Sequence, residues 1–122
     1  MTALIAEDAS ELETLGFVLR VREGHAAEYL RRHDEIWPEM AGALLEAGIL
    51  HYEIWLHAPT RFLFGHQIRR RGQGPSAVGE AVMARWRVYM ADVLEMEGDM
   101  PFREPLSRQF RLVAQSGVKG SL

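Results

Sequence analysis

The chain of 122 residues contains no cysteine, which excludes disulfides, thiolate metal sites and cysteine nucleophiles. It has no excess of basic residues, because 14 Lys and Arg stand against 17 Asp and Glu. This balance argues against a nucleic-acid partner. The longest uncharged run has eight residues, 72–79, whereas a membrane-spanning helix needs about 20 apolar residues. No basic segment precedes the short apolar stretch at the N-terminus, so we expect no signal peptide and a cytoplasmic location.

The composition that is present is typical of a soluble globular protein. Hydrophobic residues make up 48% of the chain and charged residues 25%. The length suits one domain and is too short for a cofactor domain joined to a substrate domain. We expect an N-terminal leader over residues 1–14, a single domain over 15–113 and a C-terminal tail over 114–122.

The hydrophobic pattern switches between strand and helix periods along the domain. Alternating apolar residues predict strands over 15–22, 49–57, 61–69 and 107–113, and helical spacing predicts helices over 25–36, 39–47 and 76–96. Pro38 marks a break or the first turn of a new helix, Gly48 a left-handed cap and Ser76 an N-terminal cap. This order predicts an α+β fold, the ferredoxin-like βαββαβ unit with one antiparallel four-stranded sheet.

Both helical regions of this fold cover the same face of the sheet, so the other face needs a partner. That face carries Trp55 and other bulky residues, which are costly to leave in water. Pairing two such sheets about a two-fold axis buries both faces. We therefore expect a homodimer.

Three aromatic or titratable residues recur at steps of four in the first helical region. They are Tyr29, His33 and Trp37, and positions four apart share one face of a helix. Aromatic faces stack on sugars, hydroxyls and imidazoles bind sugar hydroxyls, and a histidine exchanges protons near neutral pH. The group therefore favours a carbohydrate site, although core aromatics with a hydrogen-bonded histidine between them would give the same pattern.

Tyr52 alternates with Leu50, Ile54 and Leu56 and is predicted to point toward the helices. A buried tyrosine hydroxyl needs a partner, and a polar pocket containing His33 would supply one. Trp86 and Tyr89 would close the same pocket, or each of these residues simply packs.

Several kinds of site have no support in the sequence. The five histidines include no ligand pair backed by a carboxylate, so we expect no metal. Gly72-Gln73-Gly74 lacks the lysine and hydroxyl of a phosphate loop, and no dinucleotide fingerprint or serine elbow is present. We expect no cofactor, and the residues alone do not name a substrate.

Four segments resemble the L-rhamnose mutarotase family over about residues 15–113. They are Glu-Tyr-Leu-Arg-Arg-His-Asp-Glu-Ile-Trp-Pro-Glu at 28–39, Tyr-Glu-Ile-Trp-Leu at 52–56, Leu-Phe-Gly at 63–65 and Arg-Trp-Arg-Val-Tyr-Met-Ala-Asp-Val at 85–93. The resemblance implies a dimeric α/β barrel of ferredoxin-like units. It also implies that His33 is the catalytic proton donor and that Tyr29 and Tyr52 bind sugar.

The chain departs from the family pattern at the rim of the expected pocket. A pair of tryptophans usual in the family is Trp86-Arg87 here, and His51 stands where a small polar residue is usual. We expect Trp86 and Arg87 to contact substrate together with the two tyrosines.

The resemblance implies a mutarotase that interconverts the α and β anomers of a 6-deoxyhexose, such as L-rhamnose, by acid/base ring opening. This reaction needs a monosaccharide partner and no cofactor. Two alternatives stay open. The same dimeric fold serves cofactor-independent monooxygenases and polyketide cyclases, and a non-catalytic ligand-binding dimer would share the same features.

Overall fold

The computed structural model describes residues 11–114. Its helices are α2 (Ala26–Asp34), α3 (Pro38–Glu46) and α4 (Ala77–Met90). Its strands are β1 (Leu12–Arg20), β2 (Ile49–His57), β3 (Phe62–Arg70), β4 (Met96–Glu97), β5 (Met100–Pro101) and β6 (Glu104–Leu106).

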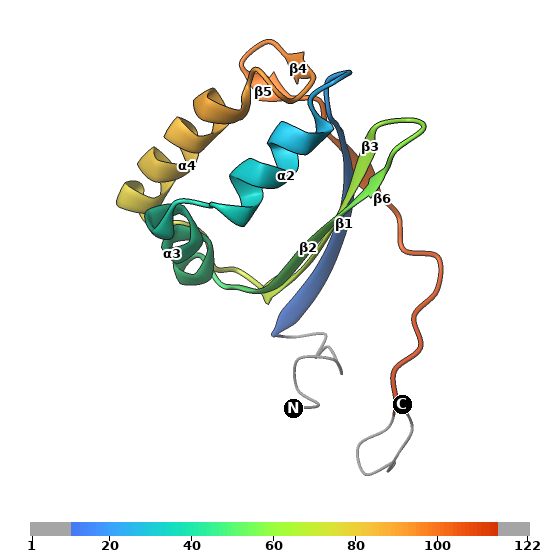
Figure 1. Ribbon diagram of the computed structural model, residues 1–122. Coiled ribbons are helices and arrows are strands. Elements are labelled where there is room, and N and C mark those ends of the chain that lie inside the picture. The colour runs from blue at the N-terminus through green and yellow to red at the C-terminus, as the bar shows by residue number, and fades with distance from the viewer. Residues whose placement is uncertain (1–10, 115–122) are drawn as a thin grey trace.

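Four of these strands form one antiparallel sheet in the order β2-β3-β1-β6, and β4 and β5 form a separate small hairpin. The helices α2, α3 and α4 lie on one side of the four-stranded sheet (Figure 1). This architecture confirms the predicted ferredoxin-like α+β fold. The helices predicted over 25–36 and 39–47 correspond to α2 and α3.

The local signals for helix ends behave as the sequence indicates. Pro38 occupies the first turn of α3. A backbone N–H in this turn has no partner within the helix, so its absence in proline costs no hydrogen bond. Gly48 follows that helix with φ +98°, a conformation that other residues rarely adopt. The hydroxyl of Ser76 accepts a hydrogen bond from the N–H of Gly79 at 3.1 Å and so caps α4.

The predicted end of the long helix at Met96 is wrong, because α4 ends at Met90. The backbone beyond it bonds to the end of the first strand instead. Arg22 N–H donates to the carbonyl of Val93 at 2.8 Å, and Glu95 N–H donates to the carbonyl of Arg20 at 2.9 Å. Val93 is fully buried in the core, and its burial stabilises these hydrogen bonds between residues 93–95 and the end of the first strand.

Both ends of the sheet differ from the prediction. The first strand begins at Leu12, three residues before the expected position, and the last strand is β6 at 104–106, not 107–113. Residues 107–114 leave β6 as an extended arm without a ladder partner within residues 11–114 (Figure 1). The expected leader lies outside the described residues over 1–10, and the expected tail does so over 115–122.

The core lies between the sheet and the helices. Its buried members are Val21, Tyr29, Met40, Ala43, Leu63, Val82, Trp86, Met90, Val93 and Leu94. Leu56, predicted to share the inward face with Tyr52, is exposed, and so are Leu30 of α2 and Val78 of α4. Gly79, one position after Val78, packs against Ala43, so the phase of α4 turns Val78 outward.

Candidate functional site

Helix α2 brings Tyr29 and His33 together on its inner side. Their rings lie 4.4 Å apart between centroids, and Tyr29 is buried while His33 is half-buried. The spacing of four residues produces this contact directly, because side chains at i and i+4 stand above one another.

The hydrogen bond of His33 fixes which ring nitrogen carries its proton. Nδ1 lies 3.2 Å from the backbone carbonyl oxygen of Tyr29, and a carbonyl can only accept, so Nδ1 is the protonated nitrogen of the neutral ring. The Nε2 lone pair is then available to take a proton. Burial lowers the pKa of His33, opposed by the Tyr29 carbonyl and the charge of Asp34. Neutral imidazole is therefore the resting form at pH 7.

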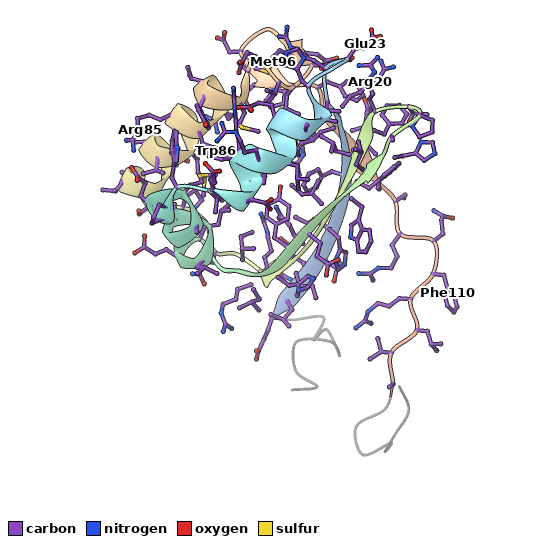
Figure 2. The ribbon with its side chains drawn as sticks, in the orientation of Figure 1. Arg20, Glu23, Arg85, Trp86, Met96 and Phe110 are labelled. Atoms are coloured by element: carbon purple, nitrogen blue, oxygen red, sulfur yellow. The ribbon has the colours of Figure 1, made fainter. Side chains whose placement is uncertain are left out.

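An aromatic wall stands beside this pair on the side of α4. The Trp86 ring meets His33 edge-on at 5.6 Å and Trp37 edge-on at 5.0 Å, and it lies between α4 and α2 (Figure 2). Tyr89 packs on both tryptophans, at 5.1 Å from Trp37 and 5.4 Å from Trp86. Trp37 thus joins the wall although α2 ends at Asp34 and Trp37 lies before the first turn of α3.

The sheet supplies the opposite wall. Tyr52 on β2 meets Phe17 of β1 edge-on at 6.1 Å, and the guanidinium of Arg103 lies 3.9 Å from the Phe17 ring centroid. Burial raises the pKa of Tyr52, opposed by the side chain of Gln67 and the charge of Arg103. Burial also raises the pKa of Tyr29, helped by Tyr52. Both phenols are therefore hydrogen-bond donors that keep their protons at neutral pH.

One arginine ties the helix that carries His33 to the end of α4. Arg32 Nη1 donates to the carbonyl of Tyr89 at 2.6 Å and to Oδ1 of Asp92 at 2.8 Å, while Nε donates to Oε2 of Glu28 at 2.7 Å. The two arginines beside Glu28, Arg31 and Arg32, lower the pKa of that carboxyl to about 2. This network sets the spacing between the His33 helix and the aromatic wall.

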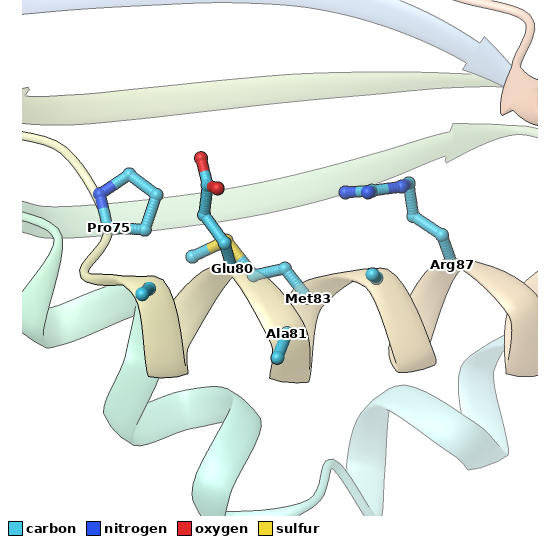
Figure 3. A pocket seen from close by; sticks show the side chains of 7 residues that line it. Pro75, Glu80, Ala81, Met83 and Arg87 are labelled. Carbon is cyan, nitrogen blue, oxygen red and sulfur yellow. The ribbon is translucent and has the colours of Figure 1, made fainter.

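A pocket of about 540 Å³ borders the sheet-facing side of α4 and its preceding loop. Its lining residues are Pro75, Ala77, Glu80, Ala81, Met83, Ala84 and Arg87. Figure 3 shows Glu80, Met83 and Arg87 projecting from α4 toward the strands. Arg87 is half-buried and forms no hydrogen bond or ion pair with the rest of the described chain. No other predicted site residue lines this pocket; Arg87 directly follows Trp86 of the aromatic wall in the chain.

Sequence reasoning missed Arg103 and Gln67. Arg103 follows a turn-rich stretch that carries no periodic signal. Gln67, in contrast, is a buried polar residue on the inward face of β3 beside Leu63 and Gly65, and a polar residue in an apolar alternation was a usable signal. Among residues 11–114, no group of three or more His, Asp or Glu side chains is placed to hold a metal ion.

Comparison with known proteins decides the family. The model of the L-rhamnose mutarotase family matches residues 14–112. The chain belongs to the L-rhamnose mutarotase family. It is 44% identical to the L-rhamnose mutarotase of Acidiphilium cryptum over 83% of this chain and 99% of that one. The L-rhamnose mutarotase of Agrobacterium fabrum is 40% identical over 84% and 97% of the two chains.

A solved mutarotase supports the fold. The crystal structure of an L-rhamnose mutarotase from Formosa agariphila superposes with a TM-score of 0.71 at 28% identity, covering 82% of this chain and 98% of that one. As a member of this mutarotase family the chain is an isomerase that interconverts sugar anomers. The monooxygenase, cyclase and binding-protein alternatives are not favoured. No helix within residues 11–114 is long and apolar enough to cross a membrane.

Proposed function

We propose that the chain interconverts the α and β anomers of L-rhamnose, with His33 as the group that moves the anomeric proton. The observation that carries this proposal is the hydrogen bond from His33 Nδ1 to the Tyr29 carbonyl. It leaves Nε2 as a base beside the rings of Tyr29 and Trp86. The names of the similar proteins suggest L-rhamnose as the substrate.

Ring opening moves two protons. Nε2 of His33 takes the proton from O1, the C1–O5 bond breaks, and its electron pair goes to O5, which is protonated by a water molecule or a hydroxyl donor. Rotation about C1–C2 presents the other face of the aldehyde, and the reverse transfers close the ring. The raised pKa values of Tyr29 and Tyr52 make tyrosinate unfavourable, so we assign these hydroxyls to orienting the sugar and the water rather than to net proton loss.

We assign the remaining substrate contacts to α4. Trp86 is 8% exposed, and its ring contacts those of His33, Trp37 and Tyr89. The uncovered edge is the part we expect to meet the apolar side of the sugar. Arg87, one residue further, supplies free guanidinium donors from the pocket beside it.

We further propose that two copies pair through the uncovered face of the sheet. Trp55 on this face is 66% exposed, and Phe64 and Leu106 are exposed beside it. The extended arm adds Phe110 at 79% and Leu112 at 84% exposure (Figure 2). A second copy would cover this apolar surface and offer a ladder partner to the arm. The cytoplasmic location remains a prediction.

Exchange spectroscopy by NMR tests the activity. Saturation transfer between the α and β H1 signals of L-rhamnose gives the exchange rate, and the protein is expected to raise it in proportion to its concentration. An unchanged exchange rate with folded protein would reject mutarotation of L-rhamnose.

Sedimentation equilibrium tests the pairing. We expect a mass twice the 13.9 kDa of one chain, and we expect Trp55→Glu to shift the protein toward monomer. Leu45→Glu is the matched control, since Leu45 is equally exposed but lies on α3. A wild-type monomer at micromolar concentration would contradict the pairing.

A further inference from the structure

The arginines of this chain differ in how their charges are matched. Ion pairs with carboxylates are formed by Arg20, Arg31, Arg32, Arg61, Arg69, Arg71 and Arg85. Two arginines next to the candidate site, Arg87 and Arg103, form no ion pair within residues 11–114. The site therefore contains positive charge that the described protein does not neutralise.

Arg87 stands on the helix side of the site. It adjoins Trp86, whose ring contacts His33 at 5.6 Å, and it lines the pocket on the strand-facing side of α4 (Figure 3). Its side chain is half-buried, so part of its hydration is already lost without a protein acceptor in exchange. A planar guanidinium in this situation matches a carboxylate through two parallel hydrogen bonds.

Arg103 stands on the sheet side of the site. Its guanidinium packs on Phe17 at 3.9 Å, and Phe17 in turn contacts Tyr52. Burial raises the pKa of Tyr52, and the side chain of Gln67 and, less strongly, the charge of Arg103 lower it. Arg87 on α4 and Arg103 beside the sheet are thus two cations on the two elements that form the walls of the site.

One carboxylate reduces this positive potential. Glu80 lines the same pocket as Arg87 and lies seven residues, two helical turns, before it. It is exposed and forms no ion pair with Arg87, so solvent screens its charge more than that of the half-buried guanidinium. Arg87, Arg103 and Glu80 together carry one net positive charge.

We propose that this site accepts hexuronates, reducing sugars with a carboxylate at C6, in addition to neutral deoxysugars, and that Arg87 binds the carboxylate. The inference rests on the proposed mutarotase function, since a hexuronate with a free anomeric centre undergoes the same ring opening. Arg103 contributes long-range attraction for the anion. A hexuronate differs from its parent hexose only at C6, which makes the preference measurable within matched pairs.

The test compares enzyme-dependent anomer exchange for three pairs by saturation-transfer NMR: D-galacturonate with D-galactose, D-glucuronate with D-glucose, and L-guluronate with L-gulose. L-Rhamnose is the reference substrate. In at least one pair we expect the acid to exchange about tenfold faster than the neutral sugar, as expected for a charge-assisted hydrogen bond. Added salt is expected to lower the enzyme-dependent exchange rate of the acid and to leave that of its neutral partner unchanged.

Variants assign the preference to a residue. Arg87→Gln is expected to lower the ratio of the acid's exchange rate to the neutral sugar's exchange rate about tenfold. Arg87→Lys is expected to retain part of this ratio because the charge remains. Arg85→Gln is the matched control, because Arg85 lies on the same helix as Arg87 but bonds to Glu39 of α3 and does not line the pocket. The control is expected to leave the ratio unchanged.

The possible failures are distinguishable. If L-rhamnose exchange is accelerated but no acid exceeds its neutral partner, the hexuronate inference is overturned and the mutarotase proposal stands. The same conclusion follows if Arg87→Gln, folded by circular dichroism, keeps the wild-type ratio. If no sugar of either class is accelerated, both proposals are rejected.

Discussion

Gly65→Ala is a perturbation in the sheet that supports the candidate site, and its effect follows from the packing of Phe17 on Gly65. Gly65 on β3 lies opposite Phe17 on β1, and the Phe17 ring lies over the glycine. A Cβ at position 65 would fall inside van der Waals contact with three ring atoms of Phe17. Phe17 is 1% exposed, so the ring has no free space to enter and must push its neighbours.

The cost can be estimated from two opposing effects. Adding a methyl group to a packed core costs about 1–3 kcal/mol, and replacing glycine by alanine recovers about 0.4–1 kcal/mol by restricting the unfolded chain. The net expectation is a loss of about 1–2 kcal/mol in the free energy of unfolding. Gly42→Ala is the control, because nothing lies within 4 Å of a Cβ in this α3 position. It should stabilise the protein by about 0.5–1 kcal/mol.

Urea unfolding of the three proteins at one protein concentration measures both effects. The displaced Phe17 ring contacts Tyr52 at 6.1 Å and Arg103 at 3.9 Å, so Gly65→Ala should also raise KM for the sugar more than it changes kcat. If Gly65→Ala is as stable as the wild type and binds sugar equally well, the packing of Phe17 does not support the site as described.

Two further predictions concern titration and capping. Because burial lowers the pKa of His33 and the neutral ring is the base, the exchange rate should rise with pH and level off below the usual histidine pKa of about 6.5. A rate that falls as pH rises through this range would mean that the protonated ring is required. Ser76→Ala removes the cap of α4 and should cost about 1 kcal/mol in urea unfolding. Ser107→Ala, in the extended arm, should leave stability unchanged, and equal effects of the two changes would argue against the cap.

Local rules predicted the elements whose ends are decided locally. Pro38, Gly48 and Ser76 mark helix ends through their own backbone or side-chain chemistry, so the sequence was sufficient. The end of α4 was not predictable in this way, because Arg20 and Arg22 of a distant segment take the backbone hydrogen bonds of residues 93–95. The position of the last strand depends equally on pairing with β1.

The candidate site was predictable to the extent that one helix or one strand determines it. Spacing of four residues joins Tyr29 to His33, and alternation turns Tyr52 inward. The residues that surround them are brought there by contacts between distant segments, which local patterns do not record. Arg103 reaches Phe17 only because β6 pairs with β1, and no pattern near residue 103 records that pairing.

The central claim is that His33 moves the anomeric proton. The most direct measurement is the exchange rate of L-rhamnose anomers by saturation-transfer NMR for the wild type, His33→Ala and His57→Ala. His57 is an exposed histidine that bonds Thr60 in the turn after β2, so its loss should leave the rate unchanged. A positioned proton transfer contributes roughly 10²–10⁴-fold, and His33→Ala should therefore lower the enzyme-dependent rate at least about 100-fold while circular dichroism stays the same. A folded His33→Ala protein that exchanges the anomers at the wild-type rate would contradict the claim.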